Sequence, residues 1–304
     1  MTNESLHARL ARAGLGRLAN DIIRLSMSSI RMDCRRVSDE TALPLGSSKL
    51  GGKPDLQSSR IWPLWKSSPM AFVGQVNLAD IAAHDAEGHL PHSGLLSFFC
   101  AVDGTAAGLL REPNDPRSWV VSHFNGDLAA LTRLPLPPKL AECLRFAACQ
   151  PSFSREPTLP DVGSREILGL RFSEVERQAY VDIQSSADVG YVSAMTHRLL
   201  GYPYCFDRSP LVPGYLKTHG IPNPFTRIAG SDPQEFQDRW EELQHQWQDF
   251  QHKAESEWRL LLQVFSNEEA QMDWGGGGVL HFCMSQEALS RRDFENVWLE
   301  MQFV

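Results

Sequence analysis

Two stretches of the chain repeat the same order of apolar and polar positions. Each contains a glycine-proline turn, then an apolar run that carries one glutamine, then a second apolar run that begins with glycine. The first copy comprises residues 48–54, 70–78 and 90–99, and the second comprises residues 197–203, 258–264 and 276–282. Short apolar runs between turn residues predict buried strands. Three matches in one order predict an internal duplication.

The glutamines of the two runs, Gln75 and Gln263, stand among apolar residues. A polar side chain in a buried strand needs hydrogen-bond partners inside the protein. Two interpretations follow. Each glutamine satisfies the backbone of a loop at the matching place in its repeat, or the two glutamines face a shared groove that binds a ligand.

The clearest helix is predicted at about 231–258. Ser231 is placed as its N-cap, Pro233 lies in the first turn, and Gln234 completes a capping box. Apolar residues recur at alternating spacings of 4 and 3: Phe236, Trp240, Leu243, Trp247, Phe250 and Ala254. This stripe predicts that the helix packs on the core through one face, with contact to a partner as the alternative. Acidic residues, among them Glu241, Glu242 and Asp249, lie mostly around the other face.

The remaining segments predict smaller elements. Residues 5–25 suit an amphipathic helix broken near Gly14 and Gly16, and a half-buried strand follows at 28–37. A further helix is expected from Ser173, with Glu176 as its reciprocal cap. The segments 103–118 and 150–165 are rich in turn residues and are predicted to be surface loops.

Together these elements predict an α+β fold of mostly antiparallel sheets with flanking helices. We expect residues 1–304 to form a single duplicated unit. Its parts are an N-terminal helix and strand at 1–45, a first repeat at 46–160, and a second repeat at 161–304 with the inserted helix.

Composition and charge narrow the functional classes. With 304 residues, 42% of them hydrophobic and 22% charged, the chain has ample material for a core. Its net charge of −8, without a basic cluster, disfavours direct binding to nucleic acid and permits a basic protein partner. No run of about 18 apolar residues and no export signal is present, so we expect a cytoplasmic protein without a membrane contact. Six cysteines without a CxxC pair agree with a reducing compartment.

Candidate catalytic chemistry is weak throughout. The glycines at 275–278 precede an apolar run rather than a helix, so they predict a turn and not a phosphate loop. His84, His89 and His92 match no zinc spacing. No GxSxG or HExxH motif occurs. We therefore expect no enzymatic activity, no cofactor and no metal.

Two tryptophans remain as candidates for binding. Trp62 and Trp65 stand in a Trp-Pro-Leu-Trp loop. They either form a lid on the first sheet, which we favour, or are exposed aromatics that contact a partner.

Several of these motifs resemble one family. They are Ser48 to Pro54, Trp62-Pro63, Phe72 to Leu78, Leu90-Pro91 with Gly94 to Phe99, Trp274 to Phe282 and Asp293-Phe294. In combination they resemble the YwqG-like family of bacterial proteins, DUF1963. The resemblance implies a duplicated α+β fold without established catalytic residues. The chain departs from the family at Tyr204-Cys205-Phe206, where a glutamine is frequent, and this argues against two equivalent sites.

The resemblance also implies a function, because relatives of this family occur beside secreted bacterial toxins. It suggests a non-catalytic immunity protein that binds and neutralises a co-encoded toxin with a basic surface, such as a nuclease of a type VI secretion system. Candidate partner contacts are Glu241, Glu242, Asp249, Trp62 and Trp65. The alternatives are a small-molecule binder or enzyme that uses Gln75 and Gln263 in a groove between the repeats, and a scaffold that associates through the long helix.

Overall fold

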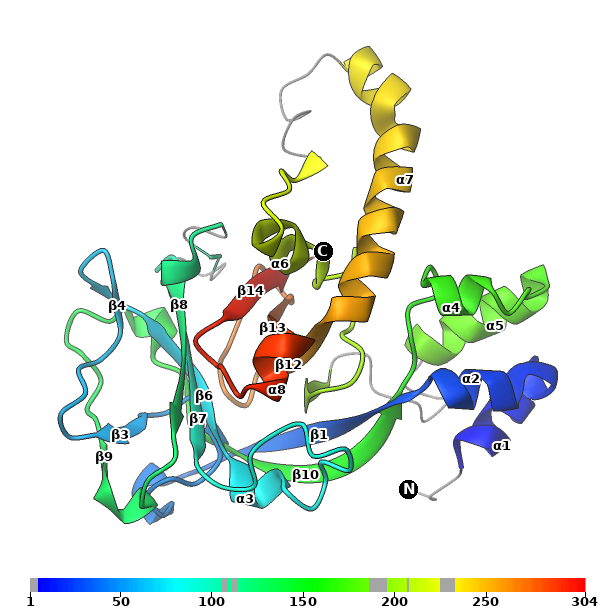
Figure 1. The fold of residues 1–304 in the computed structure, drawn as a ribbon. Coiled ribbons are helices and arrows are strands. Elements are labelled where there is room, and N and C mark those ends of the chain that lie inside the picture. The colour runs from blue at the N-terminus through cyan, green and yellow to red at the C-terminus, as the bar shows by residue number, and fades with distance from the viewer. Residues whose placement is uncertain are drawn as a thin grey trace.

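A curved sheet of ten strands dominates the fold (Figure 1). The computed structural model describes residues 5–104, 109–110, 114–185, 196–206, 208–224 and 233–303, without the side chains of residues 185 and 233–242. In spatial order the strands are β14 (Val297–Gln302), β13 (Val279–Ser285), β12 (Trp258–Phe265), β11 (His197–Leu199), β1 (Met27–Arg36), β10 (Cys149–Thr158), β2 (Lys49–Leu50), β6 (Ala71–Asn77), β7 (Leu95–Cys100) and β8 (Trp119–Phe124). Neighbouring strands are antiparallel.

The order of the strands divides the sheet into two matching halves. β2, β6, β7 and β8 follow one another on one side, and β11, β12, β13 and β14 do so on the other. Between them β1 and β10 pair along their whole length, from Met27 opposite Thr158 to Arg36 opposite Cys149. β1 joins the second half through β11, whereas β10 joins the first half through β2. The N-terminal strand is therefore part of the centre of the sheet.

The sheet curves until its two ends meet through side chains. Phe98 of β7 and Phe282 of β13 pack edge to face at 5.1 Å between ring centroids, and Trp119 of β8 and Trp298 of β14 do so at 5.2 Å. Trp119 also donates a hydrogen bond from Nε1 to the carbonyl of Val297 at 2.8 Å. One hydrophobic core runs through both halves, inside a sheet that is nearly closed.

Short elements complete the body. Two ribbons of two strands, β3 (Asp55–Gln57) with β9 (Leu131–Arg133) and β4 (Leu64–Trp65) with β5 (Ser68–Pro69), lie in the first half of the chain. Small helices follow strands as α3 (Leu78–Ile81) and α8 (Gln286–Ser290), and α6 (Val212–Thr218) contacts β13, β14 and α7. The α+β class and the mostly antiparallel sheet are as the sequence predicts.

The N-terminal helices form a second, smaller core. α1 (Leu6–Leu10) and α2 (Ala19–Leu25) are separated by irregular turns in which Gly14 has a φ of +86°, so the predicted break is confirmed. They pack with α4 (Arg165–Leu168) and α5 (Glu174–Ser185). The predicted capping box at Ser173 is also confirmed, because the Ser173 N–H donates to Glu176 Oε2 and the Glu176 N–H donates to Ser173 Oγ.

The prediction that residues 150–165 form a surface loop is wrong for most of the segment. Residues 149–158 form β10, which pairs with β1 throughout. Its prolines, Pro151 and Pro157, suggested a loop because proline cannot donate to a ladder. They are tolerated because β10 pairs with β2 only at Cys149, which leaves the rest of that side of the strand without a ladder.

The long helix α7 (Pro233–Glu257) extends away from the sheet (Figure 1). The predicted apolar face is confirmed in its described part, where Leu243, Trp247 and Ala254 are buried and Phe250 is half-buried. The predicted N-cap Ser231 and the side chains of Phe236 and Trp240 lie outside the described part. No helix in the described part of the chain is long and apolar enough to cross a membrane.

Candidate functional site

Gln75 and Gln263 occupy equivalent places in the two halves. Gln75 lies opposite Lys49 of β2, and Gln263 lies opposite Arg198 of β11. A β-bulge interrupts the pairing two residues before each glutamine, at Val73 and at Leu261. The carbonyls of these two bulge residues accept hydrogen bonds from the residues that follow β2 and β11, Gly51 and Leu200.

The hydrogen bonds of the two glutamine side chains also match. Gln75 Oε1 accepts from the Asp55 N–H at 2.9 Å, and its Nε2 donates to the Ser47 carbonyl at 2.8 Å. Gln263 Oε1 accepts from the Tyr204 N–H at 2.8 Å, and its Nε2 donates to the Thr196 carbonyl at 2.9 Å.

In the sequence, the residue whose N–H donates lies six positions after the strand residue opposite each glutamine, and the residue whose carbonyl accepts lies two positions before it. Both glutamine side chains are fully buried. The interpretation that each glutamine satisfies loop backbone at the matching place is therefore confirmed.

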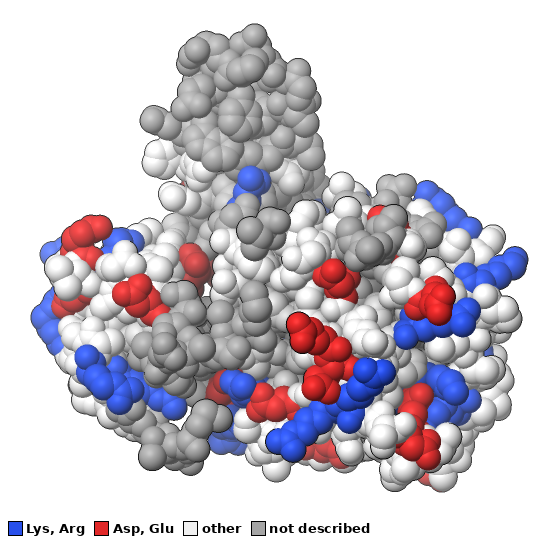
Figure 2. All heavy atoms as spheres, turned by 180° about the vertical axis from the view of Figure 1, so that it is seen from behind, with Lys and Arg blue, Asp and Glu red and all other residues white. Residues whose placement is uncertain are grey.

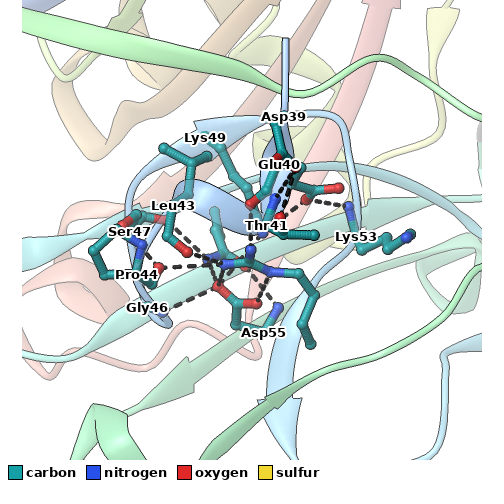
Figure 3. A network of polar contacts seen from close by, with 12 residues as sticks. Asp39, Glu40, Thr41, Leu43, Pro44, Gly46, Ser47, Lys49, Lys53 and Asp55 are labelled. Carbon is teal, nitrogen blue, oxygen red and sulfur yellow. Dashed lines mark hydrogen bonds and ion pairs between the residues drawn. The ribbon is translucent and has the colours of Figure 1, made fainter. Parts of the chain in front are cut away.

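A buried ion network is built around Asp55, beside Gln75 (Figure 3). The carboxylate of Asp55 accepts hydrogen bonds from Gln75 Nε2 at 2.8 Å, from the Gly46 N–H at 3.0 Å, and from Arg133 Nε at 2.8 Å. Lys49 Nζ lies 3.4 Å from Asp55 Oδ2 and 3.0 Å from Glu40 Oε1. The network joins the loop at 40–47 to β2, β3 and β9.

The charges of this network depend on one another. Burial would raise the pKa of Asp55, but the hydrogen bond from Arg133 and the charge of Lys49 outweigh it, so the pKa of Asp55 lies below its ordinary value. Burial lowers the pKa of Lys49, and the carboxylates of Asp55 and Glu40 offset part of this effect. Neither the Lys49 nor the Asp55 side chain has exposed surface. With both oxygens of Asp55 hydrogen-bonded and its side chain without exposed surface, the arrangement stabilises structure rather than supplying a base.

In the second half, Arg198 stands where Lys49 stands and lies 3.5 Å from Glu156 Oε1, and an aromatic residue takes the place of Asp55. Tyr204 stands where Asp55 stands in the first half, and its ring packs on Phe265 at 5.5 Å. His281, opposite Gln263, is fully buried, and burial lowers its pKa to about 3, so the ring is neutral at pH 7. The two places share backbone geometry and differ in chemistry.

The two tryptophans pack as a lid. Trp62 is 7% exposed and Trp65 is 8% exposed. Trp62 Nε1 donates to the Met70 carbonyl at 2.9 Å, and its ring packs on Phe99. The predicted lid is confirmed, and contact of these residues with a partner stays a prediction.

The glycine loop before β13 binds a carboxylate of the chain itself. Gly275, Gly276 and Gly277 have φ values of +67°, +83° and +115°, a conformation that side chains disfavour. The N–H groups of Gly276 and Gly277 donate to Asp273 Oδ1 at 3.0 and 2.9 Å. The predicted turn is confirmed, and the amides that a phosphate would need are already engaged.

In the loop that carries His84, His89 and His92, His89 Nε2 lies 2.8 Å from Glu87 Oε2. No group of three potential metal ligands occurs in the described part of the chain.

The acidic candidates on α7 are only partly described. Asp249 is exposed, and the side chains of Glu241 and Glu242 lie outside the described part. Over Pro233–Glu257 the helix carries seven acidic residues against two basic ones. On the face of the body shown in Figure 2, cationic and anionic side chains are interspersed.

Residues 48–302 match the family described as a domain of unknown function, DUF1963. The chain belongs to this family. The match begins at the residue before β2 and ends with β14, so it covers both halves of the sheet. A search of curated proteins finds no significant match.

Sequence reasoning missed Lys49, Asp55 and Arg133. Lys49 lies in the motif Ser48 to Pro54 that carries the family resemblance, where it stands directly before an apolar residue and two glycines. The signal for Asp55 was its place after Pro54, near the predicted turn. Arg133 is 78 residues further along the chain, and nothing in its local sequence indicates this contact.

Proposed function

We propose that this protein is a non-catalytic binding protein that recognises a basic protein surface through α7. The observation that carries this proposal is the helix itself, which extends from the body and has seven acidic residues against two basic ones, a net charge of −5 in a chain whose net charge is −8. Its buried residues, such as Leu243 and Trp247, anchor its C-terminal half. An acidic helix on a fixed base favours fast association with a basic partner.

The specific form of the proposal is an immunity protein of the bacterial cytoplasm that neutralises a co-encoded toxin. It rests on the resemblance of the motifs to proteins found beside toxin genes, and the acidity of α7 agrees with it. A nuclease delivered by type VI secretion would present the basic substrate cleft that such a helix complements.

The experiment is co-expression with the product of the neighbouring gene. We expect protection of the cells and a stable complex on size-exclusion chromatography. A variant with Glu241→Lys, Glu242→Lys and Asp249→Lys should weaken the complex at least tenfold, because three attractive charges become repulsive. Glu268→Lys, on an exposed loop residue of the body, serves as the matched charge control.

Two outcomes would overturn the proposal. One is the absence of both protection and a complex. The other is an equal affinity for the α7 variant and the Glu268→Lys control, which would exclude α7 as the contact surface.

The proposal extends to the origin of the two halves, which we infer to be an internal duplication. Its support is the matching strand order, the matching bulges and the matching hydrogen bonds of Gln75 and Gln263. The duplication explains the core, while the ion network of Asp55 and the long helix α7 distinguish the halves.

A further inference from the structure

A cavity of about 420 Å³ lies at the seam where the two ends of the sheet meet. One wall is β8, and the other is the segment between α8 and β14. Its lining includes Trp119 and His123 from the first wall, Arg292, Phe294 and Val297 from the second, and Arg60 from the loop after β3. The volume is in the range that small-molecule ligands fill.

The floor of this seam cavity is apolar and fixed by contacts between the halves. Trp119, Phe294 and Val297 are 5%, 3% and 6% exposed. The indole of Trp119 is held by its hydrogen bond to Val297, and the ring of His123 packs edge to face on Phe294 at 5.2 Å. A ligand would therefore meet a preformed surface.

The charged groups around the floor differ in the hydrogen bonds that they make. Asp293 accepts a hydrogen bond from Asn296 Nδ2 at 2.7 Å. The guanidinium groups of Arg60 and Arg292 have no ion pair or hydrogen bond with another described residue. Glu295 stands at the rim, where it also borders the neighbouring cavity. The lining therefore carries two arginines and two carboxylates, and of these four described side chains only Asp293 is held by a hydrogen bond.

His123 adds a polar atom without a partner. Its Nε2 is buried and has no hydrogen bond within the described part of the chain. Burial lowers the pKa of His123 and the nearby charge of Arg292 adds to this effect, against a backbone hydrogen bond at Ser93 that raises the pKa. A buried ring nitrogen without a partner costs free energy unless a ligand or water meets it.

The backbone of Arg292 is strained in the way that functional sites tolerate. Arg292 follows α8 with a φ of +57°, where its N–H donates to Leu289 O and the next N–H donates to Ala288 O. Glycine is the usual residue at this position of a helix end, and a residue with a side chain is disfavoured there. The chain places a guanidinium beside the cavity in spite of this cost.

We propose that the seam cavity binds a small molecule that has a compact apolar body and one anionic group, a carboxylate or a phosphate. The body lies on Trp119 and Phe294, and the anion faces Arg60 and Arg292. This site goes beyond protein binding by α7, because none of the lining residues belongs to that helix. It also differs from the groove predicted from the sequence, because neither Gln75 nor Gln263 lines it.

The test uses three probes on the whole chain: benzoate, phenyl phosphate, and benzamide as the neutral isostere of benzoate. Binding is followed by the fluorescence of the protein, with Trp119 in the floor, and by calorimetry into the millimolar range. We expect one or both anions to bind at least tenfold more tightly than benzamide. The preferred anion identifies the group as carboxylate or phosphate.

Arg292→Gly separates binding from folding. We expect it to weaken binding of the preferred anion at least tenfold and to raise the melting temperature, because glycine relieves the positive φ. Arg171→Gly is the matched control, since Arg171 is an exposed arginine with a φ of +50° outside the cavity. It should raise the melting temperature and leave binding unchanged.

Three results would overturn the proposal: no binding of either anion, equal binding of benzoate and benzamide, or unchanged affinity in Arg292→Gly.

Discussion

At the scale of single residues, two buried glutamines, Gln75 and Gln263, have the same structural role. Each one connects the segment before a short strand to the segment after it, through a donor and an acceptor that have no solvent to replace them. Leaving a buried backbone group unsatisfied costs about 1–3 kcal/mol. The two side chains therefore determine the conformation of the loops around β2 and β11.

Truncation of either glutamine should destabilise the protein strongly. We expect Gln263→Ala to lower the free energy of unfolding by roughly 2–4 kcal/mol, because the Tyr204 N–H and the Thr196 carbonyl lose their partners. Gln75→Ala should cost more, because Asp55 also loses a donor. Urea denaturation measures both, with Gln57→Ala at an exposed site as the control. Losses equal to that of the control would contradict the role assigned to the glutamines.

The ion network gives a second prediction, which depends on pH. Asp55→Asn leaves the buried Lys49 without its full counter-charge, and we expect a loss of roughly 3–5 kcal/mol at pH 7. The pKa of Asp55 is lowered in the folded state, so the stability it contributes is present above the ordinary value of about 4 and is lost as the pH falls through the folded value.

The difference in free energy of unfolding between Asp55→Asn and the unmodified chain should therefore become smaller as the pH falls below about 4. Urea denaturation at several pH values measures it, and Glu268→Gln on the surface is the control. A difference that stays constant over this range would show that folding does not lower the pKa of Asp55.

At the scale of elements, apolar periodicity predicted the strands and the helix whose positions depend on packing against the core. β6, β7, β12 and β13 are continuous apolar runs, and α7 has a stripe at helical spacing, so all five were found from the sequence. β10 was missed because its two prolines indicated a loop. Proline is excluded from strands that pair on both sides, whereas most of β10 pairs on one side only.

The seam cavity had no signal in the sequence. Its two walls are far apart along the chain, and they meet only when the sheet curves. The local sequence around Arg60 or Arg292 therefore carries no information about their proximity.

The base of α7 carries a prediction about the helix as a unit. Glu255 lies near the end of the helix, where burial raises its pKa to about 7 against a hydrogen bond from Gln251. Glu166 and Asp161 raise the pKa further, and Arg259 lowers it. A raised folded-state pKa means that the stability contributed by this carboxyl group is present below about pH 4.5 and is lost as the pH rises through about 7.

Glu255→Gln, which is neutral at every pH, should therefore stabilise the protein at pH 8. We expect a gain of roughly 1–3 kcal/mol there and little change at pH 4. Thermal unfolding followed by circular dichroism at both pH values checks this result. Asp249→Asn, at an exposed site on the same helix, should show no such dependence, and a similar gain in that control would contradict a role for burial.

At the scale of the whole molecule, the two halves have matching backbone structure and stabilise each other. β1 pairs with the second half and β10 with the first, so neither half contains its full sheet without the other. The main core is shared across the seam, whereas the N-terminal helices with α4 and α5 have a core of their own.

This organisation predicts that the two halves of the sheet unfold as one cooperative unit. Phe98 and Phe282 come from opposite halves and are in contact. The losses in free energy of unfolding caused by Phe98→Leu and Phe282→Leu should therefore not add. We expect a coupling of roughly 0.5–1.5 kcal/mol in the double variant, the size found for aromatic pairs. Tryptophan fluorescence and circular dichroism should report a single transition for the sheet.

The control pairs Phe98→Leu with Tyr180→Phe. Tyr180 belongs to the smaller core, and the second change removes its hydrogen bond to the Pro160 carbonyl. Because the two residues share no contact, these losses should add within about 0.5 kcal/mol. If Phe98 and Phe282 were equally additive, or if Phe98→Leu shifted only one of two separate transitions, the halves would be independent folding units. The seam cavity would then lie between two mobile bodies and could not be the preformed site proposed above.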